Sequence, residues 1–181
     1  MIQQVLEESD LERHQITGLI WSAGPGSFTG VRIATSVAQG ISYALNLPLY
    51  PCSSLELTAK SVRSQMQPGQ QLLVAEDARM GEIYWASFEA TREGIGRLSD
   101  DSLSTPKEVP ISDTRLATGS AQALLDPDSE ISTWLTSSPA KANYLLPPLA
   151  DDLNAAESLS ALQAEPHYLR GESAWKRVEE Q

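Results

Sequence analysis

Short apolar runs alternate with stretches of helical periodicity in the first half of the chain. Residues 16–23 and 47–52 are mainly apolar and stop at turn-forming residues, which predicts two buried strands. Between them, apolar residues recur every three or four positions from about residue 29 to residue 45, which predicts a helix that ends at Asn46. This order of strand, loop, helix and strand is typical of an α/β protein.

Two further helices are predicted on either side of this unit. The apolar residues within 1–13 are spaced as one stripe of an amphipathic helix. Ser53, followed three positions later by Glu56, is a capping-box pattern that opens a helix extending to about Met66.

The second half of the chain is predicted to contain strands, loops and short helices. Aromatic and β-branched residues favour strands at 71–75 and 83–88, and an antiparallel strand is expected after the turn at 92–96. Ser, Asp and Pro at 99–110 indicate a loop or a crossing between lobes. The later predicted elements are a strand at 115–118, a short helix at 120–125 and a helix at 149–163 that follows two prolines.

Composition narrows the classes of function. Thirteen Lys and Arg against 24 Asp and Glu give the 181-residue chain a net charge of −11, the wrong sign for wrapping a phosphate backbone unaided. The one cysteine, Cys52, excludes an intrachain disulfide and a multi-thiolate zinc site, and it is expected to be a buried thiol. No apolar run is long enough for a membrane span and no export signal is visible, so cytoplasmic residence is the expectation.

A glycine-rich segment separates the first predicted strand from the long helix. Its glycines permit positive φ and close backbone approach, and Ser27 or Thr29 is suited to cap the helix. The segment lacks the Lys-Ser/Thr ending of a Walker loop and the spacing of a dinucleotide fingerprint, so a phosphate-type loop and a structural turn both stay open. This glycine loop consists of Gly24, Pro25, Gly26, Ser27, Phe28, Thr29 and Gly30.

Three sequence blocks resemble a known family. GPGSFTGVRIATSVAQG at 24–40, DARMGEIY at 77–84 and EPHYLR at 165–170 are similar, in order and spacing, to the signature blocks of the TsaB (YeaZ) family. The similarity covers essentially the whole chain. It implies a two-lobed α/β fold of the actin/Hsp70/sugar-kinase type (the ASKHA fold), with residues 1–98 as the remainder of the first lobe and 99–181 as the second lobe and tail.

The resemblance also implies a function. Family members are dimerisation subunits in bacterial tRNA threonylcarbamoyladenosine synthesis: they bind TsaD, which carries the metal and transfers the threonylcarbamoyl group to the tRNA adenosine next to the anticodon. The ATPase TsaE completes the machinery. The chain is accordingly expected to be a non-catalytic scaffold that meets tRNA only indirectly, with a homodimer as a further assembly. The alternatives are a glycoprotease-like peptidase or an ATPase of the same fold, and an interaction module with another partner.

The reactive residues agree with a non-catalytic role. His14 and His167 are the only histidines and lie far apart in sequence, so no close pair suggests a metal site. Ser27 has no evident histidine partner that would make it a nucleophile. We therefore expect no catalytic residue and no metal ligand in this chain.

In the family, the helix after the glycine loop and the helix before it pack against two equivalent helices of TsaD. These helices correspond to residues 29–45 and 1–8 here. Small residues between branched ones in the first of them permit close helix approach, whereas burial entirely within the domain is the competing interpretation. The predicted partner-interface residues are Val31, Ile33, Ala34, Val37, Ala38 and Ile41.

Charged residues also gather at the turn between two predicted strands. This turn is interpreted either as a local ion pair with a turn glycine or as a loop that faces the inter-lobe cleft and contacts nucleotide or a partner. Its residues are Asp77, Arg79, Gly81 and Glu82. The aromatic and basic residues within 168–177 are expected to pack on a lobe rather than to bind nucleic acid.

The chain departs from the family at its N-terminus. Family members begin with a strand bearing an AIDTS-like phosphate loop and a hairpin, whereas Met1 aligns within the first family helix. A start codon placed too late is favoured over a genuinely shortened form. Because nucleotide binding of the sugar-kinase type uses that loop, we expect no nucleotide on this chain alone, and ATP and metal on the partner subunits.

Overall fold

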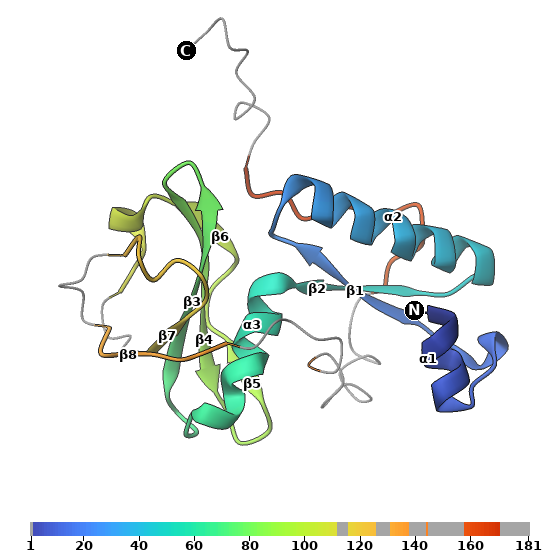
Figure 1. The fold of residues 1–181 in the computed structure, drawn as a ribbon, viewed down its shortest axis with the longest axis horizontal. Helices are drawn as coiled ribbons and strands as arrows, with labels where there is room; N and C mark the ends of the chain where they lie inside the picture. The colour runs from blue at the N-terminus through green and yellow to red at the C-terminus, as the bar shows by residue number, and fades with distance from the viewer. Residues whose placement is uncertain (1, 112–115, 126–130, 138–143, 145–157, 171–181) are drawn as a thin grey trace, which may run out of the picture.

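The computed structural model describes residues 2–111, 116–125, 131–137, 144 and 158–170. Two sheets lie side by side, with one helix between them (Figure 1). The smaller sheet pairs β1 (Leu19–Gly24) with β2 (Leu49–Ser53) in parallel, and α2 (Phe28–Leu45) connects the two strands and packs on β1. This is the predicted strand, helix and strand unit.

Both ends of α2 are fixed by the residues that the sequence indicated. The Ser27 side chain accepts a hydrogen bond from the Gly30 N–H at 3.2 Å, which satisfies one of the free donors of the first turn. At the other end, Asn46 adopts the left-handed conformation (φ 53°) and its N–H bonds the Ser42 carbonyl. Before this unit lie α1 (Ile2–Ser9) and a 3-10 turn, η1 (Arg13–Gln15).

The larger sheet has the order β5-β4-β3-β7-β8, and β6 also pairs with β4. Its strands β3, β4 and β5 are antiparallel, whereas β7 and β8 run parallel to β3. The strands are β3 (Gln71–Arg79), β4 (Glu82–Ala90), β5 (Ile95–Arg97), β6 (Ser102–Ser104), β7 (Leu116–Thr118) and β8 (Thr133–Trp134). The larger sheet thus contains strands from both sides of residue 98, where the boundary between the two lobes was expected. That boundary stays a prediction.

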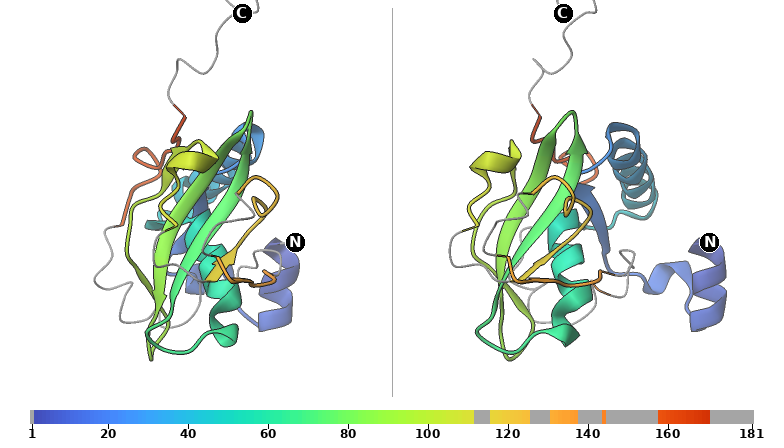
Figure 2. Two further views of the ribbon diagram at one scale, coloured as in Figure 1. Left: turned by 90° about the vertical axis from the view of Figure 1, so that its left-hand side faces the viewer. Right: turned by 60° about the vertical axis from the view of Figure 1, so that its left-hand side comes forward.

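Helix α3 (Ser54–Val62), continued by η2 (Arg63–Gln65), covers one face of the larger sheet and also contacts β1 and β2. In the right-hand view of Figure 2, α2, β1, α3 and the larger sheet follow one another as layers. Residues 72–75 of β3 are all fully buried, because α3 covers one face and the segments around η3 (Pro106–Glu108) and residues 121–125 cover the other.

Three expectations need correction. Residues 120–125 form a single turn rather than a helix, and the Ser120 N–H and hydroxyl donate to the Glu76 carboxylate of β3. Residues 149–157 of the helix expected at 149–163 lie outside the described residues, and the remainder forms a bridge from Leu159 to Leu49 followed by a turn. The loop expected at 99–110 contains β6 and η3.

A glycine substitution tests the contact between β3 and β7. Gly119 has φ +109°, and a Cβ there would lie 2.2 Å from the Ala75 carbonyl oxygen. Gly119→Ala is expected to lower the free energy of unfolding by about 2–3 kcal/mol in urea denaturation, because the backbone must move. Gly94→Ala is the matched control: its Cβ would meet nothing within 4 Å, so a change below about 0.5 kcal/mol is expected. Equal effects of the two changes would contradict this account.

Candidate functional site

The three sequence blocks that are distant along the chain meet around one cavity. Its volume is about 1040 Å³, and its walls come from the glycine loop, from the tip of the β3–β4 hairpin and from residues 164–170, here called the C-terminal strap. The start of α3 contributes Ser54 and Thr58. Concave sites of this size with mixed apolar and polar walls are where proteins commonly bind ligands.

The glycine loop is shaped by close backbone contacts. Gly24 has φ +116°, and a Cβ there would lie 2.9 Å from the His167 carbonyl oxygen, so this position requires glycine. The Ser54 hydroxyl donates to the Pro25 carbonyl from the start of α3. Ser27 is used as the cap of α2, and the Gly24–Pro25 peptide bond is cis. Both the strap and α3 therefore hold this loop in place.

The hairpin tip contains the charged turn. Arg79, Met80 and Gly81 are three consecutive residues with positive φ. The Asp77 carboxylate accepts the Arg79 N–H at 2.7 Å and pairs with the Arg79 guanidinium at 3.1 Å, which is the predicted local ion pair. Asp77 and Arg79 also line the cavity, whereas Glu82 pairs with Arg170 of the strap. A role of this turn in binding stays a prediction.

The C-terminal strap joins the two sheets. The His167 N–H donates to the Ala23 carbonyl at the end of β1 (2.7 Å), and Gln39 of α2 donates to the Ala164 carbonyl (2.8 Å). At its other end, the Arg170 guanidinium donates to the Ala78 carbonyl (3.2 Å) and pairs with the Glu82 carboxylate. The strap thus packs on the fold, as expected for residues 168–170.

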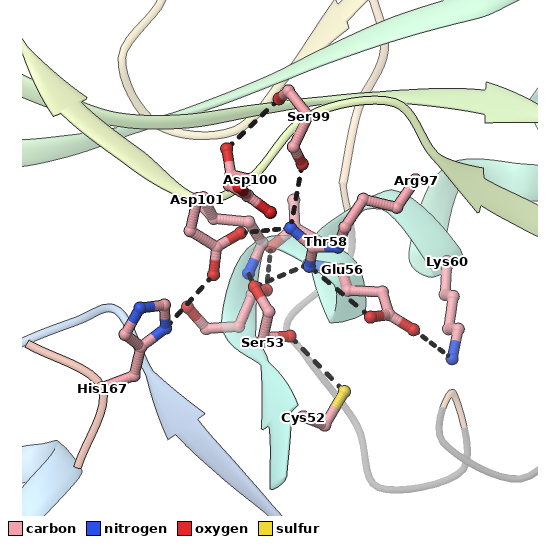
Figure 3. Close-up of polar contacts among 12 residues, drawn as sticks. Cys52, Ser53, Glu56, Thr58, Lys60, Arg97, Ser99, Asp100, Asp101 and His167 are labelled. Carbon is pink, nitrogen blue, oxygen red and sulfur yellow. Dashed lines mark hydrogen bonds and ion pairs between the residues drawn. The ribbon is translucent and has the colours of Figure 1, made fainter. Parts of the chain in front are cut away.

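Charged side chains are linked beneath the strap (Figure 3). The Asp101 side chain is only 2% exposed; it pairs with Arg97 at 2.6 Å and lies 3.6 Å from His167 Nδ1. Burial acts to lower the pKa of Arg97, but the hydrogen bond and charge of Asp101, with Glu56, outweigh it and raise that pKa. Glu56 also pairs with Lys60 at 2.7 Å. Arg97 therefore stays a cation that compensates the buried carboxylate.

Two residues of this region, His167 and Asp101, were not predicted as site residues from the sequence. His167 lines the same cavity as Ser27, although the two are far apart along the chain, and Asp101 lies 3.6 Å from His167 Nδ1. No hydrogen bond between Ser27 and His167 occurs in the described part of the chain. The histidine within EPHYLR was a signal for His167, whereas Asp101 lies in a Ser- and Asp-rich segment without a pattern.

Within the described ranges, no group of three or more His, Cys, Asp or Glu side chains is placed to hold a metal ion. None of the described helices is both long and apolar enough to cross a membrane.

The predicted interface residues divide between two faces of α2. Val31 and Ala38 are buried at 7% and 6% exposure, and Ala34 packs toward the same core with Trp21. Ile33 and Val37, by contrast, are 59% and 50% exposed. The sixth residue, Ile41, is intermediate. The helix therefore covers β1 with one face and presents apolar side chains on another.

Comparison with known proteins first defines the class. Residues 1–123 match the family model described as TsaD: tRNA N6-adenosine threonylcarbamoyltransferase. A structure described as YeaZ from Pseudomonas aeruginosa superposes with a TM-score of 0.81 at 26% identity, covering 93% of this chain and 82% of that one. A second Pseudomonas aeruginosa structure, described as an uncharacterized protein with similarity to peptidase YEAZ, gives a TM-score of 0.80 at 26% identity, over 94% and 81% of the two chains. The fold is thus α/β of the ASKHA type.

Two curated relatives identify the family. The tRNA threonylcarbamoyladenosine biosynthesis protein TsaB of Haemophilus influenzae is 30% identical over 98% of this chain and 80% of its own length. The TsaB protein of Escherichia coli is 31% identical over 98% and 81%. The chain belongs to the TsaB family, within the wider group that the transferase model describes.

The environment of Cys52 gives a testable chemical property. Burial, with a smaller contribution from the Glu56 carboxylate, raises the pKa of Cys52 to about 12. Only a minute fraction of this thiol is ionised at about pH 8, where an ordinary thiol near its pKa reacts readily. Iodoacetamide should therefore modify Cys52 at least about 100-fold more slowly in the native chain than in concentrated urea. Similar rates, measured by mass spectrometry, would contradict the raised pKa of this half-buried thiol.

Proposed function

We propose that the chain is a non-catalytic subunit of tRNA threonylcarbamoyladenosine biosynthesis, which binds TsaD and supports the transfer that TsaD carries out. Its family membership supports the pathway, and the match to the TsaD family model is consistent with a related partner fold. In this proposal ATP and metal belong to the partner subunits, this chain alone binds no nucleotide, and tRNA is met only through the complex. Since tRNA is the substrate of that complex, the site of action is the cytoplasm.

The observation that carries the proposal is the outward face of α2. Ile33, Val37 and Tyr43 are 59%, 50% and 78% exposed, and a Cβ added at Gly40 of the same helix would meet nothing within 4 Å. Contiguous apolar side chains on a surface indicate an interaction site, and small residues let a second helix approach closely. We infer that this face packs against a helix of TsaD, with a homodimer through the same face when TsaD is absent. TsaE joins the assembled pair.

A charge substitution on this face tests the assembly. Val37→Asp should abolish co-elution with the cognate TsaD in size-exclusion chromatography with light scattering, because a carboxylate would be buried in an apolar contact. Leu98→Asp is the matched control, since Leu98 is 49% exposed but lies on the larger sheet near β5. Thermal unfolding of each variant establishes that it is folded. Co-elution of a folded Val37→Asp variant would remove the basis for this interface.

A peptidase is the second candidate, and one specific arrangement favours it. Asp101 lies 3.6 Å from His167 Nδ1, and Ser27 lines the same cavity as His167, so the three residue types that nucleophilic catalysis uses are present in one region. Against this, the Ser27 oxygen accepts the Gly30 N–H as a helix cap.

The scaffold proposal predicts no turnover. Incubation of the pure chain with an unfolded protein or with a glycoprotein should yield no new fragments, and incubation with ATP should release no phosphate. Cleavage that persists in the wild type and disappears in both Ser27→Ala and His167→Ala would establish the peptidase instead. Cleavage that survives both changes would point to a contaminating protease and leave the scaffold proposal standing.

A further inference from the structure

We propose that the cavity between the glycine loop, the hairpin tip and the C-terminal strap binds a small amphipathic carboxylate, meaning a ligand that joins an apolar or aromatic body to one carboxylate group. The cavity belongs to this chain alone. The proposal therefore does not depend on assembly with TsaD.

The walls of the cavity suit an apolar body. Phe28, Met80, Tyr168 and Leu169 line it, and the first three are 40%, 75% and 45% exposed. A volume of about 1040 Å³ is at the upper end of what small-molecule sites occupy. Filling the cavity with an apolar ligand would remove these side chains from water, which is the usual source of affinity in such sites.

Arg32 supplies the group that would recognise an anion. Its guanidinium carbon lies 3.6 Å from the centroid of the Phe28 ring, and its Nε donates to the Tyr168 hydroxyl at 2.7 Å. The side chain is thus held by stacking and by one hydrogen bond, while its two terminal amino groups make no ion pair with a carboxylate of the described ranges. A guanidinium fixed in this way is arranged for a two-pronged contact with a carboxylate, and little conformational entropy is lost on binding.

The other charges of the cavity favour a single negative charge over a polyphosphate. Three arginines, Arg32, Arg79 and Arg170, line the cavity together with the carboxylates of Glu76 and Asp77. Asp77 engages Arg79 and Glu82 engages Arg170, so Arg32 is the lining arginine without an ion pair among the described residues. A ligand with several negative charges would be repelled by these carboxylates and by a chain whose net charge is −11. One carboxylate, placed at Arg32 and away from Glu76, meets the positive group without that penalty. The N-terminal end of α2 adds a weaker positive potential on the same side.

A tyrosine of β4 offers a second point of contact. Tyr84 lines the cavity, and within the described segments no hydrogen bond of its hydroxyl occurs. It is available to a ligand amide or carbonyl once the carboxylate lies at Arg32. Together the two groups would fix the orientation of a ligand whose body rests on Phe28 and Leu169.

The test compares an acid with its neutral analogue on the full chain. N-acetyl-L-phenylalanine, N-acetyl-L-leucine and N-benzoylglycine are titrated against the ¹⁵N-labelled protein, beside the corresponding primary amides. We expect at least one acid to shift the amide signals of residues 28–32, 80 and 168–169, with an affinity about tenfold or more above that of its amide. Equal affinity of acid and amide for all three pairs, or shifts confined to other surfaces, would overturn the proposal.

Variants assign the recognition to Arg32. Arg32→Gln should reduce affinity for the acid to that of the amide, and Arg32→Lys should restore part of it, because lysine keeps the charge but not the planar fork. Arg92→Gln, in the exposed turn after β4, is the control and should bind as the wild type does. If Arg32→Gln binds the acid unchanged while its spectrum shows an intact fold, then Arg32 only holds the strap against α2, and the proposal fails. Stronger binding of ATP than of any acid, lost in Arg32→Gln, would replace it with a nucleotide site.

Discussion

One backbone hydrogen bond, from the His167 N–H to the Ala23 carbonyl, fixes the C-terminal strap to the end of β1. It places the strap directly over Gly24, where no side chain larger than hydrogen is accommodated. From this point the strap reaches α2 through Tyr168 and the hairpin tip through Arg170. The cavity walls therefore depend on a contact between segments that are separated by most of the chain.

The buried Asp101 carboxylate supports the same junction between the strap and the rest of the fold. Asp101 is withdrawn from water, which is unfavourable for a charged group unless a partner compensates it. Arg97 provides that compensation, and the Arg97 guanidinium also lies 5.0 Å from the centroid of the fully buried Phe88 ring. The charged network is thus fastened to the core of the larger sheet, while His167 connects it to the strap. Removing Arg97 would leave the buried Asp101 carboxylate without its arginine partner, whereas removing Asp101 would leave Arg97 paired with Glu56.

Local sequence signals predicted the parts of the fold that local interactions determine. Ser27, Asn46 and Ser53 mark helix ends because each satisfies backbone groups within its own segment. At 120–125, where a helix was expected, the structure has a single turn whose Ser120 N–H and hydroxyl donate to the Glu76 carboxylate on β3, a contact that the local sequence does not indicate. The resemblance of three blocks indicated the family, but only the three-dimensional structure places Asp101 beside His167. Propensity carries no information on such pairs, since they depend on tertiary packing.

The two faces of α2 explain how one helix serves both the domain and a partner. Inside, Val31 and Ala38 pack on β1, and Trp21 Nε1–H donates to the buried Thr35 hydroxyl at 3.3 Å, which fixes the rotation of the helix about its axis. With that rotation fixed, Ile33 and Val37 necessarily point away from the sheet. Each of these side chains is about half exposed, so covering it would contribute on the order of 1 kcal/mol. That is too little for one residue to hold a complex, and a stable one therefore requires a contact extending along the helix past Gly40 to Tyr43.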